Sequence, residues 1–171
     1  MNLFASSDYV FTGKHSSMIN DLVSVWKIFP TNASVIPVAA LLGVLFHKKV
    51  DKDHGSAKSS VPLSALSKLD SQIQKAFQLV ILNSSTNSLD NKATIDRLFR
   101  YETGDKEDIY TFDSFVRGGI EVLHESISAN GADDDLHYMT NIHNLVNDIE
   151  ARNGNVTSTK VLETIKNMTQ E

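Results

Sequence analysis

The feature that most constrains this 171-residue chain is a run of apolar residues from Ala33 to Phe46. Its side chains leave almost no polar face, and a helix that is apolar all round is buried on most of its sides. The run contains Pro37 and is shorter than the roughly 18–20 apolar residues that a bilayer span needs. We therefore expect a buried central helix over residues 34–49, with Ser34 as its N-cap and the other segments packed around it.

Elsewhere in the chain, apolar residues recur at three- and four-residue steps, which is the pattern of amphipathic helices. Proline residues and clusters of Asn, Ser and Gly separate these segments. We find no convincing strand pattern and no internal repeat of fixed period. The sequence thus predicts an all-α fold, a single-domain bundle of about seven helices around the apolar one. The expected helices begin near His15, Ser34, Ser60, Ser88, Thr111 or Asp113, Leu136 and Ser158.

A chain of this length can bury enough surface for one self-supporting domain. We expect a helical domain over residues 1–153, which begins with an extended arm at residues 1–12. Gly154 fits the C-cap of the sixth helix, because glycine commonly ends helices in the left-handed conformation. A final amphipathic helix within residues 155–171 would then dock either on the same domain or on a partner.

Cysteine is absent, which excludes disulfides, iron–sulfur clusters and thiolate zinc sites. The first residues lack the cationic start and the long apolar run of a signal peptide. We therefore expect a cytoplasmic protein that does not engage a membrane.

The charge of −5 is unevenly distributed along the chain. Residues 1–100 carry 11 Lys and Arg against 7 Asp, whereas residues 101–171 carry 5 Lys and Arg against 14 Asp and Glu. Such asymmetry can mark an interaction surface, and it can equally arise in two halves that fold against each other. The basic half allows a nucleic-acid-associated protein as an alternative, with Lys48, Lys49 and Lys52 as candidate contacts. The negative net charge argues mildly against that alternative.

Few patterns indicate chemistry. Thr12–His15 is similar to the end of a phosphate-binding loop, but it lacks the first glycine, a Ser or Thr after the lysine, and a preceding buried strand. Glu121 and His124 have the spacing of half a di-iron carboxylate site without its second copy. We expect a solvated Glu121 and a partly buried His124. Asp133–Asp135 indicate capping of the following helix, with a divalent-ion clamp as the alternative.

We therefore expect no catalytic residue, no metal and no cofactor. A metal-dependent enzyme that uses Glu121 and His124 is the least favoured alternative.

Interaction with another protein has more support from the sequence. Gly118 and Gly119 lie in the middle of an expected helix, where each glycine costs about 0.8–1 kcal/mol relative to alanine. Close approach of another helix would offset that cost, and this helix is either the chain's own apolar one or a partner's. Arg97 and Arg100 share a helix face beside an aromatic residue, which is typical of interfaces but also of a solvated face. The candidate partner-binding residues are Lys14, His15, Arg97, Arg100, Tyr101, Arg117, Gly118 and Gly119.

Four stretches over roughly residues 11–127 together resemble a known group of proteins: FTGKHSSMINDLV, SVIPVAALLGVLFHKKVDKD, ATIDRLFRYE and FDSFVRGGIEVLHESI. The group consists of small uncharacterised all-helical proteins from bacterial DNA-modification or phage-defence gene clusters. The resemblance implies an accessory subunit that works beside a larger ATPase or nuclease of the same operon and reaches DNA through that complex. It carries over no catalytic residue.

The sequence as a whole predicts a non-catalytic protein–protein interaction subunit of a bacterial complex, in DNA processing or antiviral defence. A nucleic-acid-associated protein and a metal-dependent enzyme remain as alternatives. The identity of the partner, the stoichiometry and self-association into a homo-oligomer stay open.

Overall fold

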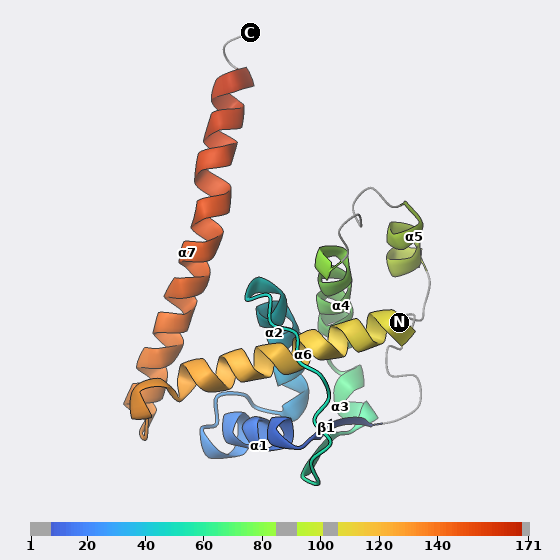
Figure 1. Ribbon diagram of the computed structural model, residues 1–171, viewed down its shortest axis with the longest axis vertical. Helices are drawn as coiled ribbons and strands as arrows, with labels where there is room; N and C mark the ends of the chain where they lie inside the picture. Colours follow the sequence, from blue (N-terminus) through green and yellow to red (C-terminus); the bar gives the residue numbers. More distant parts are fainter. Residues whose placement is uncertain (1–7, 85–91, 101–105, 169–171) are drawn as a thin grey trace. The chain divides into compact units, whose positions relative to one another are not determined.

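The computed structural model describes residues 8–84, 92–100 and 106–168, with the backbone alone at residues 93, 94, 97, 100 and 153–168. This part of the chain is mostly helical, as predicted, with one small two-stranded sheet (Figure 1). The elements are β1 (Tyr9–Thr12), α1 (Lys14–Asn20), the π-helix η1 (Asp21–Val25), α2 (Asn32–Leu45), β2 (Lys58–Val61), α3 (Leu63–Ser67), α4 (Asp70–Ser84), α5 (Lys92–Arg100), α6 (Lys106–Ile127), the 3₁₀ turn η2 (Ala129–Gly131) and α7 (Asp135–Met168).

The chain divides into two compact units, residues 1–125 and 126–171. This boundary does not coincide with the division at residues 153–155 that the sequence suggested. Among the described residues, no helix combines the length and the apolar character that a bilayer span requires.

The sheet corrects the expectation of no strands. β1 and β2 pair antiparallel, with Tyr9 opposite Val61 and Thr12 opposite Lys58. Part of the expected extended arm and the end of the expected loop over residues 50–60 are therefore strands. Phe11 and Val61 are buried. Strands of four residues are too short to give a readable two-residue alternation, so the sequence pattern missed them.

Helix α2 begins two residues earlier than expected, at Asn32, because Thr31 and Ser34 form a capping box around its first turn. It also ends earlier, at Leu45, and His47 follows in the left-handed conformation with φ 51°. One face is buried, but Val38 and Leu41 on the other face are each about two fifths exposed. The expectation of a helix enclosed on most sides is therefore met on one face.

Helix α6 crosses α2 and α4 (Figure 1) and packs against both. A Cβ atom added to Gly119 would overlap the carbonyl oxygen of Ala39 in α2, and one added to Gly43 of α2 would overlap that of Phe115. The backbones of α2 and α6 therefore approach closely through glycines on both sides. On α4, Phe77 meets Phe112 of α6 edge to face, with the ring centroids 5.5 Å apart. The close packing against α2 thus offsets the free-energy cost of a glycine at position 119, so the neighbouring helix belongs to this chain and not to a partner.

The third expected helix is two helices in the structure. Pro62, in extended conformation, precedes α3, and α4 begins at Asp70 after a short break. The sequence placed the helix start at Ser60, which instead pairs with Val10 in the sheet.

In the second unit, a tight turn precedes helix α7. Asn130 and Gly131 both have positive φ, and the side-chain amide of Asn141 donates to the carbonyl oxygens of Ile127 and Ala129 at 2.9 Å each. The backbone of α7 is helical through Gly154, so the predicted C-cap there is wrong. Glycine permits a helix end without imposing one, and inside a helix it costs about 1 kcal/mol.

The close approach of α2 and α6 gives a testable prediction. Replacement of Gly119 by alanine should lower the free energy of unfolding by about 3 kcal/mol, because the added methyl group would press on backbone that cannot move away as a side chain can. Gly131→Ala is the control: no atom lies within 4 Å of its added Cβ, and only the φ of +69° opposes it, at a cost of about 1–2 kcal/mol. Urea denaturation measures both, and equal losses would contradict the close approach.

Candidate functional site

The most unusual group in the first unit is the carboxylate of Glu121, which is buried in the middle of α6. Its side chain is only 8% exposed. Lys14 Nζ lies 2.6 Å from Oε1, Lys48 Nζ lies 3.1 Å from Oε2, and His15 Nε2 lies 3.2 Å from Oε1. Two segments of the chain, the start of α1 and the residues after α2, therefore supply charge or hydrogen bonds to one buried carboxylate. The expectation that Glu121 is solvated is wrong.

A second carboxylate, that of Asp53, positions Lys14 and His15. Its Oδ2 accepts from the backbone N–H of Lys14 at 2.7 Å, and its Oδ1 accepts from the N–H of Gly55 at 3.0 Å. Gly13, with φ +59°, leaves room for this carboxylate, which would overlap a Cβ atom at that position. These two N–H groups hold the pKa of Asp53 below its usual value.

The segment around Gly13 is therefore a strand followed by a glycine and a helix, contrary to the expectation that no strand precedes it. In a phosphate-binding loop, the backbone N–H groups at this position would receive a phosphate. Here the carboxylate of Asp53 accepts from the first of them. At this position the chain's own carboxylate therefore takes the place that a phosphate has in a phosphate-binding loop.

A neighbouring polar group ties β1 and the loop over residues 46–57 to α6. Tyr9 donates from its hydroxyl to Asp113 Oδ1 at 3.0 Å, and Arg117 donates from Nε to the carbonyl oxygen of Val50 at 2.8 Å. The N–H of Val50 in turn donates to the carbonyl oxygen of Ser114 at 3.0 Å. Asp113, Arg117 and Glu121 follow each other at four-residue spacing along α6.

Burial and charge set the protonation of these groups. Burial by itself would raise the pKa of Glu121, but hydrogen bonds and attraction from Lys14 and Lys48 outweigh it and hold the pKa below its usual value. Burial lowers the pKa of His15, and the attraction of Glu121 does not restore it. Burial raises the pKa of Asp113 to about 6, against the opposing effects of Tyr9, Arg117 and Lys52. At neutral pH the cluster thus contains a charged Glu121 and a neutral His15.

The Glu121 cluster is poorly suited to catalysis or metal binding. Both carboxylate oxygens are engaged by ammonium groups, and His15 is only 1% exposed. His124 bonds elsewhere: its Nε2 lies 2.9 Å from Asp21 Oδ2, and its ring faces Trp26. The E-x-x-H spacing therefore does not bring the two side chains to a common ligand.

One group of side chains in the described ranges has the spacing for a metal ion, namely Asp133, Asp134 and His137 at the start of α7. All three are exposed, and Asp134 Oδ1 accepts from the N–H of His137 at 2.8 Å. This is the helix-capping arrangement that the sequence indicated.

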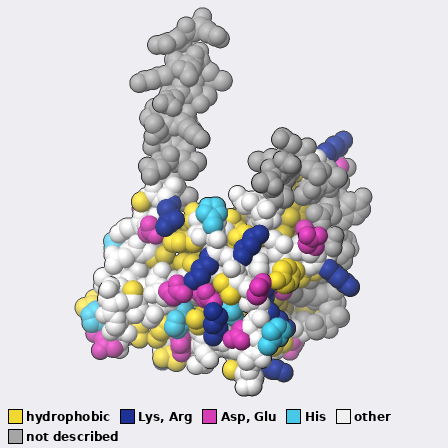
Figure 2. All heavy atoms as spheres, in the orientation of Figure 1, with side chains coloured by type: hydrophobic (Ala, Val, Ile, Leu, Met, Phe, Trp, Pro, Cys, Tyr) yellow, Lys and Arg dark blue, Asp and Glu magenta, His cyan; other side chains and the backbone are white. Residues whose placement is uncertain are grey.

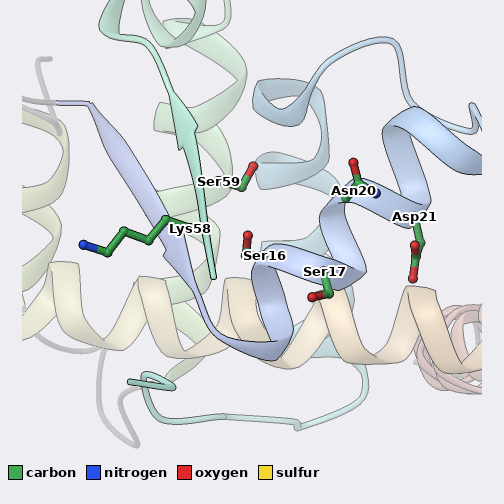
Figure 3. Close-up of a pocket in the computed structure, with 6 residues that line it drawn as sticks. All are labelled: Ser16, Ser17, Asn20, Asp21, Lys58 and Ser59. Carbon is green, nitrogen blue, oxygen red and sulfur yellow. The ribbon is translucent and has the colours of Figure 1, made fainter. Parts of the chain in front are cut away.

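An open hollow of about 330 Å³ lies beside α1 and β2 (Figure 3). In the close-up, the side chains around it leave the backbone in different directions, and that of Lys58 extends away from the others. A preformed ligand site has polar groups that converge on one point, and this hollow lacks that feature. Its lining residues are Ser16, Ser17, Asn20, Asp21, Lys58 and Ser59.

Helix α7 presents a different kind of feature, an exposed apolar face. Leu136 is 74% exposed, Met139 67% and Val146 44%. At three and seven residues apart, these side chains share one face of the helix. Asn141 and Leu145, on the opposite face, are buried. We call Leu136, Met139 and Val146 the outer face of α7.

The structure brings together some of the sequence-predicted site residues. Lys14, His15 and Lys48 meet at Glu121, and Arg117 is buried on the same helix. Gly118 and Gly119 are buried against the chain's own backbone. Lys49 lies over the ring of Phe115, 4.7 Å from its centroid, and Lys52 is exposed. The side chains of Arg97 and Arg100, and the whole of Tyr101, lie outside the described residues.

Sequence reasoning missed the roles of Tyr9, Asp53, Asp113 and Glu121. The spacing of Asp113, Arg117 and Glu121 could have indicated a charged row on the buried side of α6, since apolar residues surround each of them. Comparison with known proteins finds no matching protein family, no matching curated protein and no matching solved structure.

The buried carboxylate gives a second prediction. Glu121→Gln should lower the free energy of unfolding by about 3 kcal/mol, because the buried carboxylate would lose its charge-assisted hydrogen bonds from Lys14 and Lys48. Glu125→Gln is the matched control, one turn along the same helix: Glu125 also pairs with Lys48 but is 62% exposed, so its loss should cost less than about 1 kcal/mol. Urea denaturation at pH 7 compares the two, and a similar cost for both would contradict a special role for Glu121.

A third prediction concerns pH. The pKa of Asp113 is about 6 in the folded protein against 3.8 for the free side chain, so the folded state binds its proton more tightly than the unfolded state. The contribution of this group to stability is therefore full below about pH 4 and is lost as the pH rises through 6. Asn mimics the protonated form, so Asp113→Asn should stabilise the protein at pH 8 by about 2–3 kcal/mol and have little effect at pH 4. Thermal or urea unfolding from pH 4 to 8 measures this difference, and a loss of stability at pH 8 would refute the assignment.

Proposed function

We propose that this protein is a non-catalytic interaction subunit that docks on a larger protein through the outer face of α7. The observation that carries the proposal is the row of Leu136, Met139 and Val146, exposed on one side of a 34-residue helix. Single apolar side chains on a surface are ordinary, whereas several on one helix face are typical of interaction sites. A helix presented in this way docks in a groove or against another helix.

The length of α7 favours a docking role. A helix rises about 1.5 Å per residue, so 34 residues extend about 50 Å. Tertiary packing, rather than helix propensity, stabilises most helices in proteins. Over residues 136–146, α7 has one buried side and one exposed apolar side, so this part of the helix is well suited to receive a partner on the second side.

Two observations weigh against the nucleic-acid alternative. Of its candidate contacts, Lys48 is engaged with Glu121 and Glu125, and Lys49 lies over Phe115. On the face drawn in Figure 2, Lys and Arg side chains stand among Asp, Glu and His rather than in a separate patch. Binding to a phosphate backbone depends on a concentrated basic surface.

The enzymatic alternative has less support. Both carboxylate oxygens of Glu121 already pair with the chain's own lysines. The polar side chains around the hollow beside α1 do not converge on one point (Figure 3). That the partner is an ATPase or nuclease of a bacterial DNA-processing or antiviral assembly rests on the sequence resemblance alone.

The test is co-expression with the neighbouring genes, followed by size-exclusion chromatography with light scattering. We expect a stable hetero-complex, and we expect Met139→Asp to reduce its recovery at least about tenfold, because a charge would enter the apolar contact. Asn144→Asp is the control, with the same added charge on an exposed residue of the same helix outside the outer face. Circular dichroism checks that both variants stay helical.

A monomer with nothing bound would contradict the proposed function. A complex that survives Met139→Asp unchanged would exclude the outer face of α7 as the docking site.

A further inference from the structure

We infer that the partner of the outer face is an amphipathic helix whose apolar stripe is flanked by Lys and Arg. This inference rests on the proposed function and names the chemistry of its partner. The reason is the charge of the second unit: residues 126–152 hold five Asp and Glu and a single basic residue, Arg152. Arg152 Nε already lies 3.2 Å from Asp148 Oδ2. A partner therefore meets a surface with an excess of negative charge.

The acidic side chains lie where they border the outer face. Asp135 directly precedes Leu136, and Glu150 follows Val146 by one helical turn, so the apolar row has a carboxylate at each end. Both acids are exposed, and neither forms an ion pair with any residue whose side chain the structure describes. His143 stands within the row, one turn after Met139, and is exposed as well.

Charge complementarity selects among the occupants of such a face. If a second copy of this chain bound here, Asp135 and Glu150 would face carboxylates of like charge, which is unfavourable at contact distance. An anionic membrane surface or a nucleic acid would meet the same repulsion. A helix with basic flanks gains attraction from Asp135 and Glu150 and can bury the apolar row at the same time. Coiled coils choose partners by the same combination of an apolar seam and flanking charges.

Two labelled helical peptides test the inference with the full-length protein. They share one Leu and Ile stripe, and their flanking positions are Lys and Arg in the first and Glu in the second. By fluorescence anisotropy in 0.1 M NaCl, we expect the basic peptide to bind at least about tenfold more tightly. In 1 M NaCl, where the screening length falls from about 10 Å to about 3 Å, this preference should largely disappear.

Variants separate the two contributions to binding. The double change Asp135→Asn with Glu150→Gln should reduce the preference for the basic peptide severalfold and leave the binding in 1 M NaCl unchanged. Met139→Asp should weaken both peptides, whereas Asn144→Asp should weaken neither.

Equal binding of the two peptides, or tighter binding of the acidic one, overturns the inference while the docking function stands. A concentration-dependent dimer in sedimentation velocity that Met139→Asp abolishes also overturns it, in favour of a second copy. If neither peptide binds, the partner chemistry is wrong, and the co-expression experiment then decides separately whether the docking function fails with it.

Discussion

The fold of the first unit depends on the burial of one carboxylate. A charged group removed from water is strongly destabilising unless paired charges and hydrogen bonds surround it. Glu121 obtains these from the turn after β1, through Lys14 and His15, and from the segment after α2, through Lys48. The buried carboxylate of Glu121 needs these donors, because its side chain is only 8% exposed. One side chain of α6 therefore fixes the position of two segments that lie far from it in sequence.

Helix α6 combines this polar contact with close backbone packing. Gly119 lies against Ala39 of α2, and Gly118 lies against Lys48, whose ammonium group reaches Glu121. The same short stretch of α6 thus determines how near α2 can come and where the loop after it runs. A substitution in this stretch should lower the stability of the fold rather than change a docking surface. Docking is therefore better tested by substitutions in α7.

The sequence allowed much of the helical content to be predicted, because the apolar period extends over long segments such as α4 and α6. It also predicted that the Gly118–Gly119 pair needs a close neighbour, with the chain's own second helix as one of two alternatives. The strands were missed because four residues carry too little pattern, and α7 was divided because a glycine can end a helix without having to. The partners of Glu121 could not be predicted for a different reason: His15 lies 106 residues away in the sequence, and no local pattern shows that the two side chains meet.

The capping of α1 by Asp53 has a consequence for folding cooperativity. A helix of seven residues has almost no stability by itself in water, since its nucleation is not repaid within two turns. The first N–H of α1 is satisfied by a residue 39 positions further along the chain, and its second residue reaches across to α6. We therefore expect α1 to fold together with the segments that it contacts. Its amide protons should then exchange with solvent mainly when the 46–57 loop or α6 opens.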